Sequence, residues 1–391
     1  MSFVITAADR ASFRRCRRQW DFAAGTRQNL EPRQPPAAVD LDRALRDALA
    51  VYYYPGMWDW DRGVRLPLVV QGLERALTRP REQRHDDADA GRWHEQLETG
   101  RSLLARYFEW APTVDRFAPV LAEADYEVTV LDPARPLAGL VTGAGEPVRY
   151  RGRIDLMAVD DHDAYWIVRH RLVDGDWPPT DQLVADEETV TACWAWEQFY
   201  IGMTITGIVW NEIRRPSPSL PPPAARARLR PVTRWPRLRR RPAGPQPAVR
   251  EHEPSGGGRS IPQHRRMYAQ ARPPRRIDPI EQHVAGEFRR TWLRRSPADV
   301  AQAGRRLGAD AAEMIRHHTN VDPSPSDQHC PACPYLDPCL ALSSGHDPGP
   351  ILSSGYRRRP PEGPVEGRLG GGAWSTGRGA APPKFRGDQR R

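Results

Sequence analysis

Three of the five cysteines in this 391-residue chain lie close together near its end. The segment HCPACPYLDPC, His329–Cys339, spaces its thiols as C-x2-C-x5-C. Thiolates bind zinc in tetrahedral sites or iron in clusters, and both kinds of site usually take four ligands. Three cysteines therefore need a fourth, and the two others in the chain are Cys16, in ASFRRCRRQW, and Cys193, in TACWAWEQ.

The spacing alone leaves both the metal and the fourth ligand open. Zinc sites usually join one C-x2-C pair to a second close pair, which here would be divided between Cys339 and the distant Cys16. Cys16 also has a simpler interpretation as a small buried apolar side chain. Cys193 falls in the middle of a predicted helix, on a face that we expect to be buried. Three unrelated cysteines are the plain alternative to a metal site.

Composition narrows the setting. The chain has no run of about 18 apolar residues, and its first residues, MSFVITAADR, lack the pattern of a signal peptide. We therefore expect a cytoplasmic protein without a membrane partner, in which thiols stay reduced and a cysteine cluster indicates a metal site. The sequence gives no oligomeric state.

Charge is distributed unevenly along the chain, whose net charge is +9. Residues 1–210 hold 25 Arg against 33 Asp and Glu, whereas residues 211–391 hold 33 Lys and Arg against 16 acids. Lys384 is the only lysine, so almost every cation is an arginine. A nucleic-acid partner would thus have to contact the second half, where Arg289, Arg290, Arg294 and Arg295 add to the arginine-rich segment.

The first half alternates helical and strand patterns. Apolar residues at helical spacing predict a helix over 41–54, and a second is expected over 101–110. Alternating runs predict strands over 125–132, 148–159 and 164–172, followed by a helix over 186–202 and a strand over 205–213. This order predicts an α/β fold in which helices cover a mixed sheet.

Four regions are expected from composition. Residues 1–213 would form a helical part and the α/β core, and residues 277–342 C-terminal helices with the cysteine cluster. Residues 214–276 are rich in proline and arginine, which is typical of a disordered insertion; a nucleic-acid-binding arm and a shifted reading frame are alternatives. Within 277–342, apolar residues at every fourth position predict a helix over 280–295, and Ser296 predicts the N-cap of another. Residues 343–391 would be a loosely ordered tail.

With these motifs the chain resembles the PD-(D/E)XK nuclease superfamily, in particular its RecB-like and AddB-like iron–sulfur branch and the CRISPR-associated and phage exonucleases. The resemblance rests on ASFRRCRRQW, on HCPACPYLDPC and on the strand motif GRID, and it covers nearly the whole chain. It implies a restriction-endonuclease-like core whose two ends join at a [4Fe–4S] cluster, with zinc as the alternative. The ligands would be Cys16, Cys330, Cys333 and Cys339, the partner DNA, and the setting DNA repair.

The resemblance also implies a nuclease site, which this sequence keeps only in part. Asp155 of GRID would bind Mg²⁺ or Mn²⁺, and Glu127 lies on the preceding predicted strand. The next strand reads IVRHRL, so Arg169 stands where the second metal-binding carboxylate belongs and Arg171 where the catalytic lysine belongs. A guanidinium repels a metal cation and offers it no lone pair. Arg46 stands where the resemblance implies a histidine on the early helix.

Other residues are candidates to replace the missing ligands. His170 would serve if the register shifted by one residue, and the remaining acids of the region are Asp160, Asp161, Asp163, Asp174, Asp176, Glu187 and Glu188. Three functions therefore compete. The first hypothesis is a nuclease-like, DNA-binding protein that has lost cleavage. The others are an active Mg²⁺- or Mn²⁺-dependent DNA nuclease with displaced ligands, and a metal-stabilised interaction protein without a nucleic-acid role.

Overall fold

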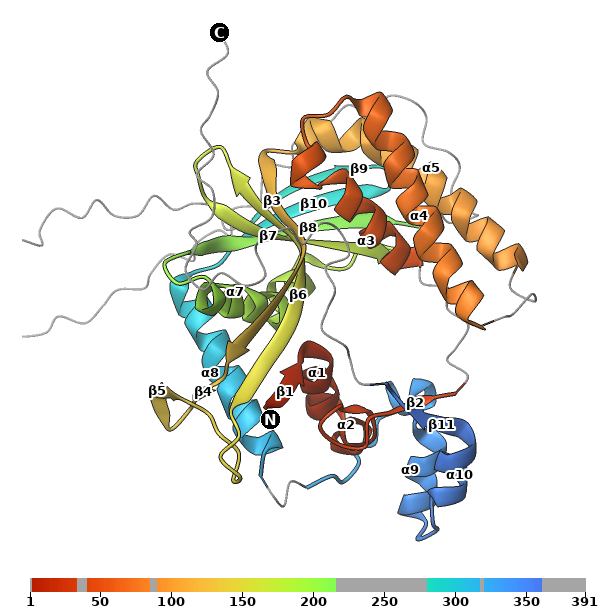
Figure 1. Cartoon of the computed structure of the whole chain (residues 1–391), viewed down its shortest axis with the longest axis vertical. Helices are drawn as coiled ribbons and strands as arrows, with labels where there is room; N and C mark the ends of the chain where they lie inside the picture. Colours follow the sequence, from red (N-terminus) through yellow and green to blue (C-terminus); the bar gives the residue numbers. More distant parts are fainter. Residues whose placement is uncertain (1, 34–40, 85–89, 216–279, 317–319, 361–391) are drawn as a thin grey trace, which may run out of the picture.

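The computed structural model describes residues 2–33, 41–84, 90–215, 280–316 and 320–360. A mixed seven-stranded sheet runs through its centre, in the order β1-β6-β7-β8-β10-β9, with β3 beside β6 (Figure 1). The strands are β1 (Phe3–Thr6), β3 (Phe117–Thr129), β6 (Val148–Asp160), β7 (Tyr165–Val173), β8 (Ile205–Arg214), β9 (Ile280–Ala285) and β10 (Phe288–Arg294). The predicted strands over 148–159, 164–172 and 205–213 are confirmed.

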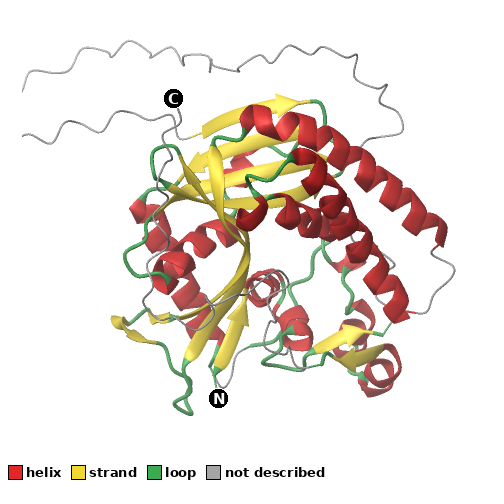
Figure 2. Ribbon diagram, turned by 45° about the horizontal axis from the view of Figure 1, so that its top comes forward, coloured by secondary structure: helices red, strands yellow, loops and turns green. Residues whose placement is uncertain are grey.

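Helices cover both faces of the sheet, as expected (Figure 2). One face carries α3 (Leu41–Tyr52), α4 (Arg62–Arg84) and α5 (Ala90–Val114). The other carries α7 (Glu187–Phe199) and α8 (Pro297–Met314), with the short α6 (Thr180–Val184) before them. The fold is therefore α/β with a mixed sheet between helices. None of the helices formed by the described residues is long and apolar enough to cross a membrane.

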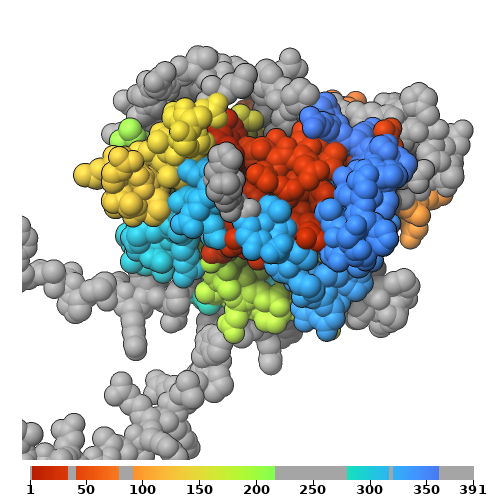
Figure 3. Space-filling model, turned by 90° about the horizontal axis from the view of Figure 1, so that it is seen from below, coloured from red at the N-terminus to blue at the C-terminus, as the bar shows by residue number. Residues whose placement is uncertain are grey.

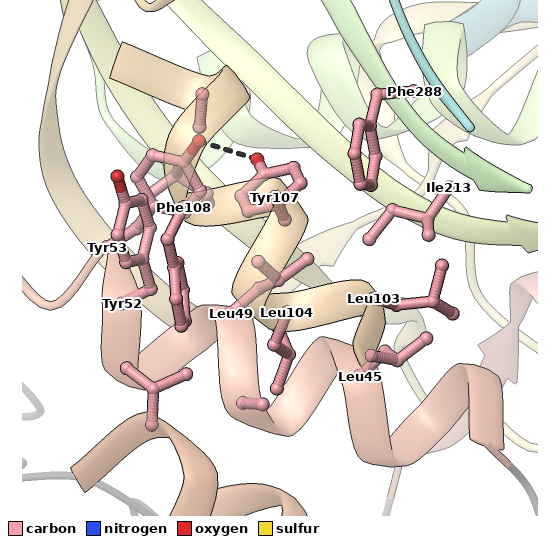
Figure 4. Close-up of a cluster of buried hydrophobic side chains, with 14 of the residues drawn as sticks. Leu45, Leu49, Tyr52, Tyr53, Leu103, Leu104, Tyr107, Phe108, Ile213 and Phe288 are labelled. Atoms are coloured by element: carbon pink, nitrogen blue, oxygen red, sulfur yellow. Dashed lines mark hydrogen bonds between the residues drawn. The ribbon is translucent and has the colours of Figure 1, made fainter. Parts of the chain in front are cut away.

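The predicted helix over 41–54 corresponds to α3, and its apolar stripe is the reason it packs where it does. Leu45 and Leu49 meet Leu103 and Leu104 of α5 in one buried cluster, and Ile213 and Phe288 of the sheet close it (Figure 4). At the start of α3, the Asp42 Oδ1 accepts a hydrogen bond of 2.6 Å from the backbone N–H of Leu172. The helix is thereby fixed to β7.

One prediction in the second half is wrong. Residues 280–295 form the β9–β10 hairpin rather than a helix, and the chain turns at Gly286, whose φ of 58° suits glycine. A repeat of four satisfies a strand's period of two as well as a helix, and the segment carries several β-branched and aromatic residues. The predicted N-cap is confirmed, because Ser296 forms a capping box with Asp299 at the start of α8.

The two ends of the described chain meet in a small subdomain. It contains α1 (Ala7–Arg15), α2 (Arg17–Ala23), β2 (Leu30–Pro32), a 3-10 turn (Cys330–Ala332), α9 (Leu336–Ser343), α10 (Gly349–Gly355) and β11 (Tyr356–Arg358). β11 pairs with β2, and Tyr335 donates to the Leu30 carbonyl over 2.6 Å. Figure 3 shows the N-terminal residues in red flanked by C-terminal residues in blue.

These contacts correct the expectation of a loose tail from residue 343 onward, because residues 349–358 form α10 and β11. Residues 216–279 and 361–391 lie outside the described residues, and with them most of the proposed insertion and the rest of the tail. The remaining elements are β4 (Leu131–Asp132), β5 (Arg135–Gly139) and a 3-10 turn (Pro55–Met57).

Candidate functional site

The three closely spaced cysteines and Cys16, the fourth ligand that the resemblance implies, line one cavity of about 30 Å³, room for an ion or a water molecule or two. Cys16 lies at the break between α1 and α2, where its backbone is extended. Cys330 begins the 3-10 turn, Cys333 follows it as its C-cap, and Cys339 lies on α9. The cavity thus joins residues more than 300 positions apart in the sequence.

Each of the four sulfur atoms accepts a hydrogen bond from an N–H group. The backbone N–H groups of Ser324 and Ser326 donate to Cys16 Sγ (3.5 Å) and Cys330 Sγ (3.3 Å), respectively. A backbone hydrogen bond from Tyr335 reaches the Cys333 thiol. The fourth donor is a side chain, since Arg18 Nη1 lies 3.9 Å from Cys339 Sγ. N–H donors stabilise thiolates, as the outer shell of a metal site requires.

The electrostatics of the cavity favour a bound cation. Burial and the neighbouring Cys16, Cys339 and Cys330 raise the pKa of the Cys333 thiol, against the opposing effect of the Tyr335 N–H. Thiolates so close to one another repel, and a metal cation removes that repulsion. Among the described residues, no three of these sulfur atoms lie within 4.8 Å of one another.

Cys193 does not belong to this cavity. It is fully buried in α7, and burial raises the pKa of its thiol well above the ordinary value. Trp194 and Trp196 of the same helix are buried too and belong to the core. Cys193 is therefore a packing residue, as its predicted position on a helix indicated.

The second candidate site surrounds Asp155 on β6. Its carboxylate is 4% exposed and accepts a 2.8 Å hydrogen bond from the backbone N–H of His170. Arg169 Nη1 lies 3.6 Å from the Asp155 Oδ1, and its Nη2 donates to Glu188 over 2.8 Å. Burial alone would lower the pKa of Arg169, but the charges of Asp155 and Glu188 raise it above its ordinary value. A permanent cation thus lies against Asp155.

Arg171 faces another partner. Its Nη2 lies 2.6 Å from the Oε1 of Glu212, and its guanidinium stacks over the Trp210 ring. Glu212 is fully buried and is also paired with Arg289. Arg171 therefore compensates a buried carboxylate on β8 and does not contribute to the surroundings of Asp155 as a catalytic lysine would.

Glu127 also lies away from Asp155. It accepts two hydrogen bonds from Arg151, its partner across the β3–β6 ladder. The ladder places Glu127 four residues from the position opposite Asp155, about 13 Å along the strand. Glu127 is therefore not placed to share a metal ion with Asp155.

Glu123 is the glutamate of β3 that lies beside Asp155. Its neighbours pair with Leu156 and Ile154, so Glu123 lies opposite Asp155. Its φ of 50° is left-handed, which is uncommon for a residue other than glycine and is found at functional sites. Burial and the negative charge of Asp155 raise the pKa of Glu123 to about 7, although Arg153 contacts it at 3.2 Å. No sequence signal marked this residue.

His170 lies on the opposite face of β7 from Arg169. Its ring stacks on Tyr53, and its Nδ1 is 2.8 Å from the Asn211 amide. Burial lowers the pKa of His170 to about 4, so the imidazole is neutral at physiological pH. The stacking and the amide contact assign it a structural role in the core.

Several of the other acids considered as replacement ligands have local partners. Asp160 closes the β6–β7 turn by accepting from the backbone of His162 and Ala164. Among the described residues, the single close group of potential metal ligands is Asp160, Asp161 and His162, and the last two are exposed. Glu187 forms salt bridges with Arg10, Arg14 and Arg306, and these connect α1 and α8 to α7. Arg46 pairs with Asp42 on α3.

No protein-family model and no curated protein matches this chain. Its function is therefore argued from the two sites above.

Proposed function

We propose that the protein is a PD-(D/E)XK nuclease-like iron–sulfur protein that binds DNA and has lost phosphodiester cleavage. The observation that supports this proposal most directly is the guanidinium of Arg169, 3.6 Å from the Asp155 carboxylate. A nuclease of this kind needs Mg²⁺ or Mn²⁺ bound to that carboxylate, to generate hydroxide and to neutralise the developing charge. Arg169 supplies a fixed positive charge there without a coordination site.

Arg169 performs only one of the two tasks of a metal ion at Asp155. Arginine neutralises Asp155, so the buried carboxylate remains tolerable without a metal. It cannot lower the pKa of a bound water as a divalent cation does. Arg171, the residue at the lysine position, is engaged with Glu212 and Trp210. The catalytic set implied by the resemblance is thus reduced to Asp155 alone.

For the metal centre, Cys16, Cys330, Cys333 and Cys339 would hold a [4Fe–4S] cluster. The four thiols around one cavity and the N–H donor at each sulfur support this assignment. The sulfur atoms are spread more widely than three ligands of one zinc ion would be, whereas the cavity volume of about 30 Å³ suits a single ion, so zinc is the alternative to the cluster. When bound, the cluster would supply a covalent link between the two ends of the fold.

DNA binding is the second part of the proposal and rests on charge. Arg289 and Arg290 are buried, paired with Glu212 and Asp115, so they are not available to phosphates as the sequence suggested. Residues 211–391 nevertheless contain 33 Lys and Arg against 16 Asp and Glu, and this positive charge supports the proposal. The affinity for DNA should fall steeply as the salt concentration rises, because arginines that bind phosphates release counterions from the DNA. A flat salt response would favour an interaction protein without a nucleic-acid role.

Cleavage assays test the loss of activity. Single- and double-stranded DNA would be incubated with the full chain and Mg²⁺ or Mn²⁺, beside Asp155→Ala as the control. The proposal expects no difference between the two proteins. Cleavage by wild type that disappears in Asp155→Ala would overturn it.

The position of Glu123 favours a second candidate function, that of an active nuclease with displaced ligands. It places a second carboxylate opposite Asp155 on the adjacent strand. A divalent cation could use the pair only if Arg169 moved away. If wild type cleaves DNA, Glu123→Gln should then abolish cleavage, whereas Glu127→Gln should not.

A further inference from the structure

Arg18 is the one side chain that donates to a cysteine sulfur of the cavity among the described residues. It lies in the first turn of α2 and lines the cavity. Its Nη1 is 3.9 Å from Cys339 Sγ, 3.4 Å from the Cys339 carbonyl oxygen and 2.9 Å from Ser343 Oγ. One guanidinium therefore contacts a ligand residue through both its sulfur and its backbone, 321 positions away along the chain.

We propose that Arg18 is a positioning residue for the metal centre, which fixes Cys339 and stabilises the negative charge on its thiolate. The inference rests on the proposed four-cysteine centre and adds the residue that tunes it. The other three sulfurs receive neutral backbone N–H donors from the C-terminal segment, at Ser324, Ser326 and Tyr335. Arg18 is instead a full positive charge from the opposite end of the chain.

Two consequences follow from the charge and the geometry. A cation beside a thiolate ligand stabilises the more negative, reduced state of an iron–sulfur cluster, so Arg18 would raise its reduction potential. The contacts with the Cys339 carbonyl and Ser343 also fix the end of α9, so Arg18 would slow the departure of Cys339 from the metal. Outer-shell partners of this kind typically contribute 10- to 100-fold to metal affinity.

The test compares wild type with Arg18→Gln, Arg18→Lys and Arg17→Gln, all as full-length chains purified without oxygen. Arg17→Gln is the matched control, because Arg17 is the neighbouring residue but pairs with Glu313 of α8. Iron and zinc content are measured first, then the rate at which a chelator removes the metal. For iron-loaded protein, a dithionite titration gives the reduction potential, and circular dichroism checks the fold.

We expect Arg18→Gln to lose its metal at least tenfold faster than wild type, with Arg18→Lys in between and Arg17→Gln unchanged. The iron-loaded Arg18→Gln should also show a lower potential, by about 59 mV for a tenfold change in a one-electron equilibrium. A rate of metal loss within twofold of wild type, together with an unchanged reduction potential, would overturn the role of Arg18. A wild-type protein that holds neither iron nor zinc would instead overturn the proposed metal centre.

Discussion

The cysteine-lined cavity and the surroundings of Asp155 differ in how much of the implied chemistry they retain. The cavity brings together four thiols and an N–H donor for each. Around Asp155, one carboxylate of the implied catalytic set remains and an arginine lies against it. Under the proposed function, the first arrangement would serve a metal-linked fold, and the second would serve a fold that works without a catalytic metal. Closure of the domain and cleavage of a substrate are therefore separable requirements.

The largest expected effect comes from breaking the closure. Cys330→Ser removes one ligand of a link between residues about 300 positions apart, and closing so long a loop is worth about 5 kcal/mol of unfolding free energy in the chain-entropy description. Such a loss is comparable to the whole stability of an ordinary domain. Metal analysis and denaturant unfolding would measure it.

Cys193→Ala is the matched control for that variant, because Cys193 is buried in α7 away from the cavity. It should keep the metal and lose about 1 kcal/mol through the small space that it leaves. If Cys330→Ser unfolds at the same denaturant concentration as wild type after losing its metal, the link does not stabilise the fold.

An intermediate effect is expected at Asp155. Arg169→Gln leaves the buried carboxylate without its cation, which should cost about 3 kcal/mol of unfolding free energy. Mn²⁺ should recover part of that loss in the variant and none in wild type, because only the variant exposes the carboxylate to a metal. Thermal unfolding with and without Mn²⁺ measures both.

For comparison, Arg116→Gln removes an arginine whose pair with Glu281 is exposed at both ends, and it should cost well under 1 kcal/mol. An Arg169→Gln protein as stable as Arg116→Gln would mean that Arg169 does not compensate Asp155.

Much of the fold could be predicted from the sequence, because α3, β6, β7, α7 and β8 each carry an unambiguous periodicity. The β9–β10 hairpin could not, since its four-residue repeat satisfies two periods. Asp155 and Arg169 were found through the motif, whereas Glu123 was missed. Glu123 and Glu127 lie on the same strand, and only the pairing register of β3 with β6 decides which of them lies opposite Asp155. Register depends on contacts between distant segments.

The smallest expected effect concerns Glu123 and pH. Its pKa of about 7 in the folded protein, raised by burial and then by Asp155, exceeds the ordinary value of 4.5. The folded state therefore holds a proton more tightly than the unfolded state, and stability should fall as the pH rises from about 4.5 to about 7. Glu123→Gln copies the protonated form and should remove this slope, with a gain of at most about 3 kcal/mol at pH 8. Urea unfolding at a series of pH values measures it, with Glu127→Gln as the control. If the unfolding free energy of Glu123→Gln still falls over this pH range, another group titrates there. Asp155 would then have no titrating neighbour at Glu123.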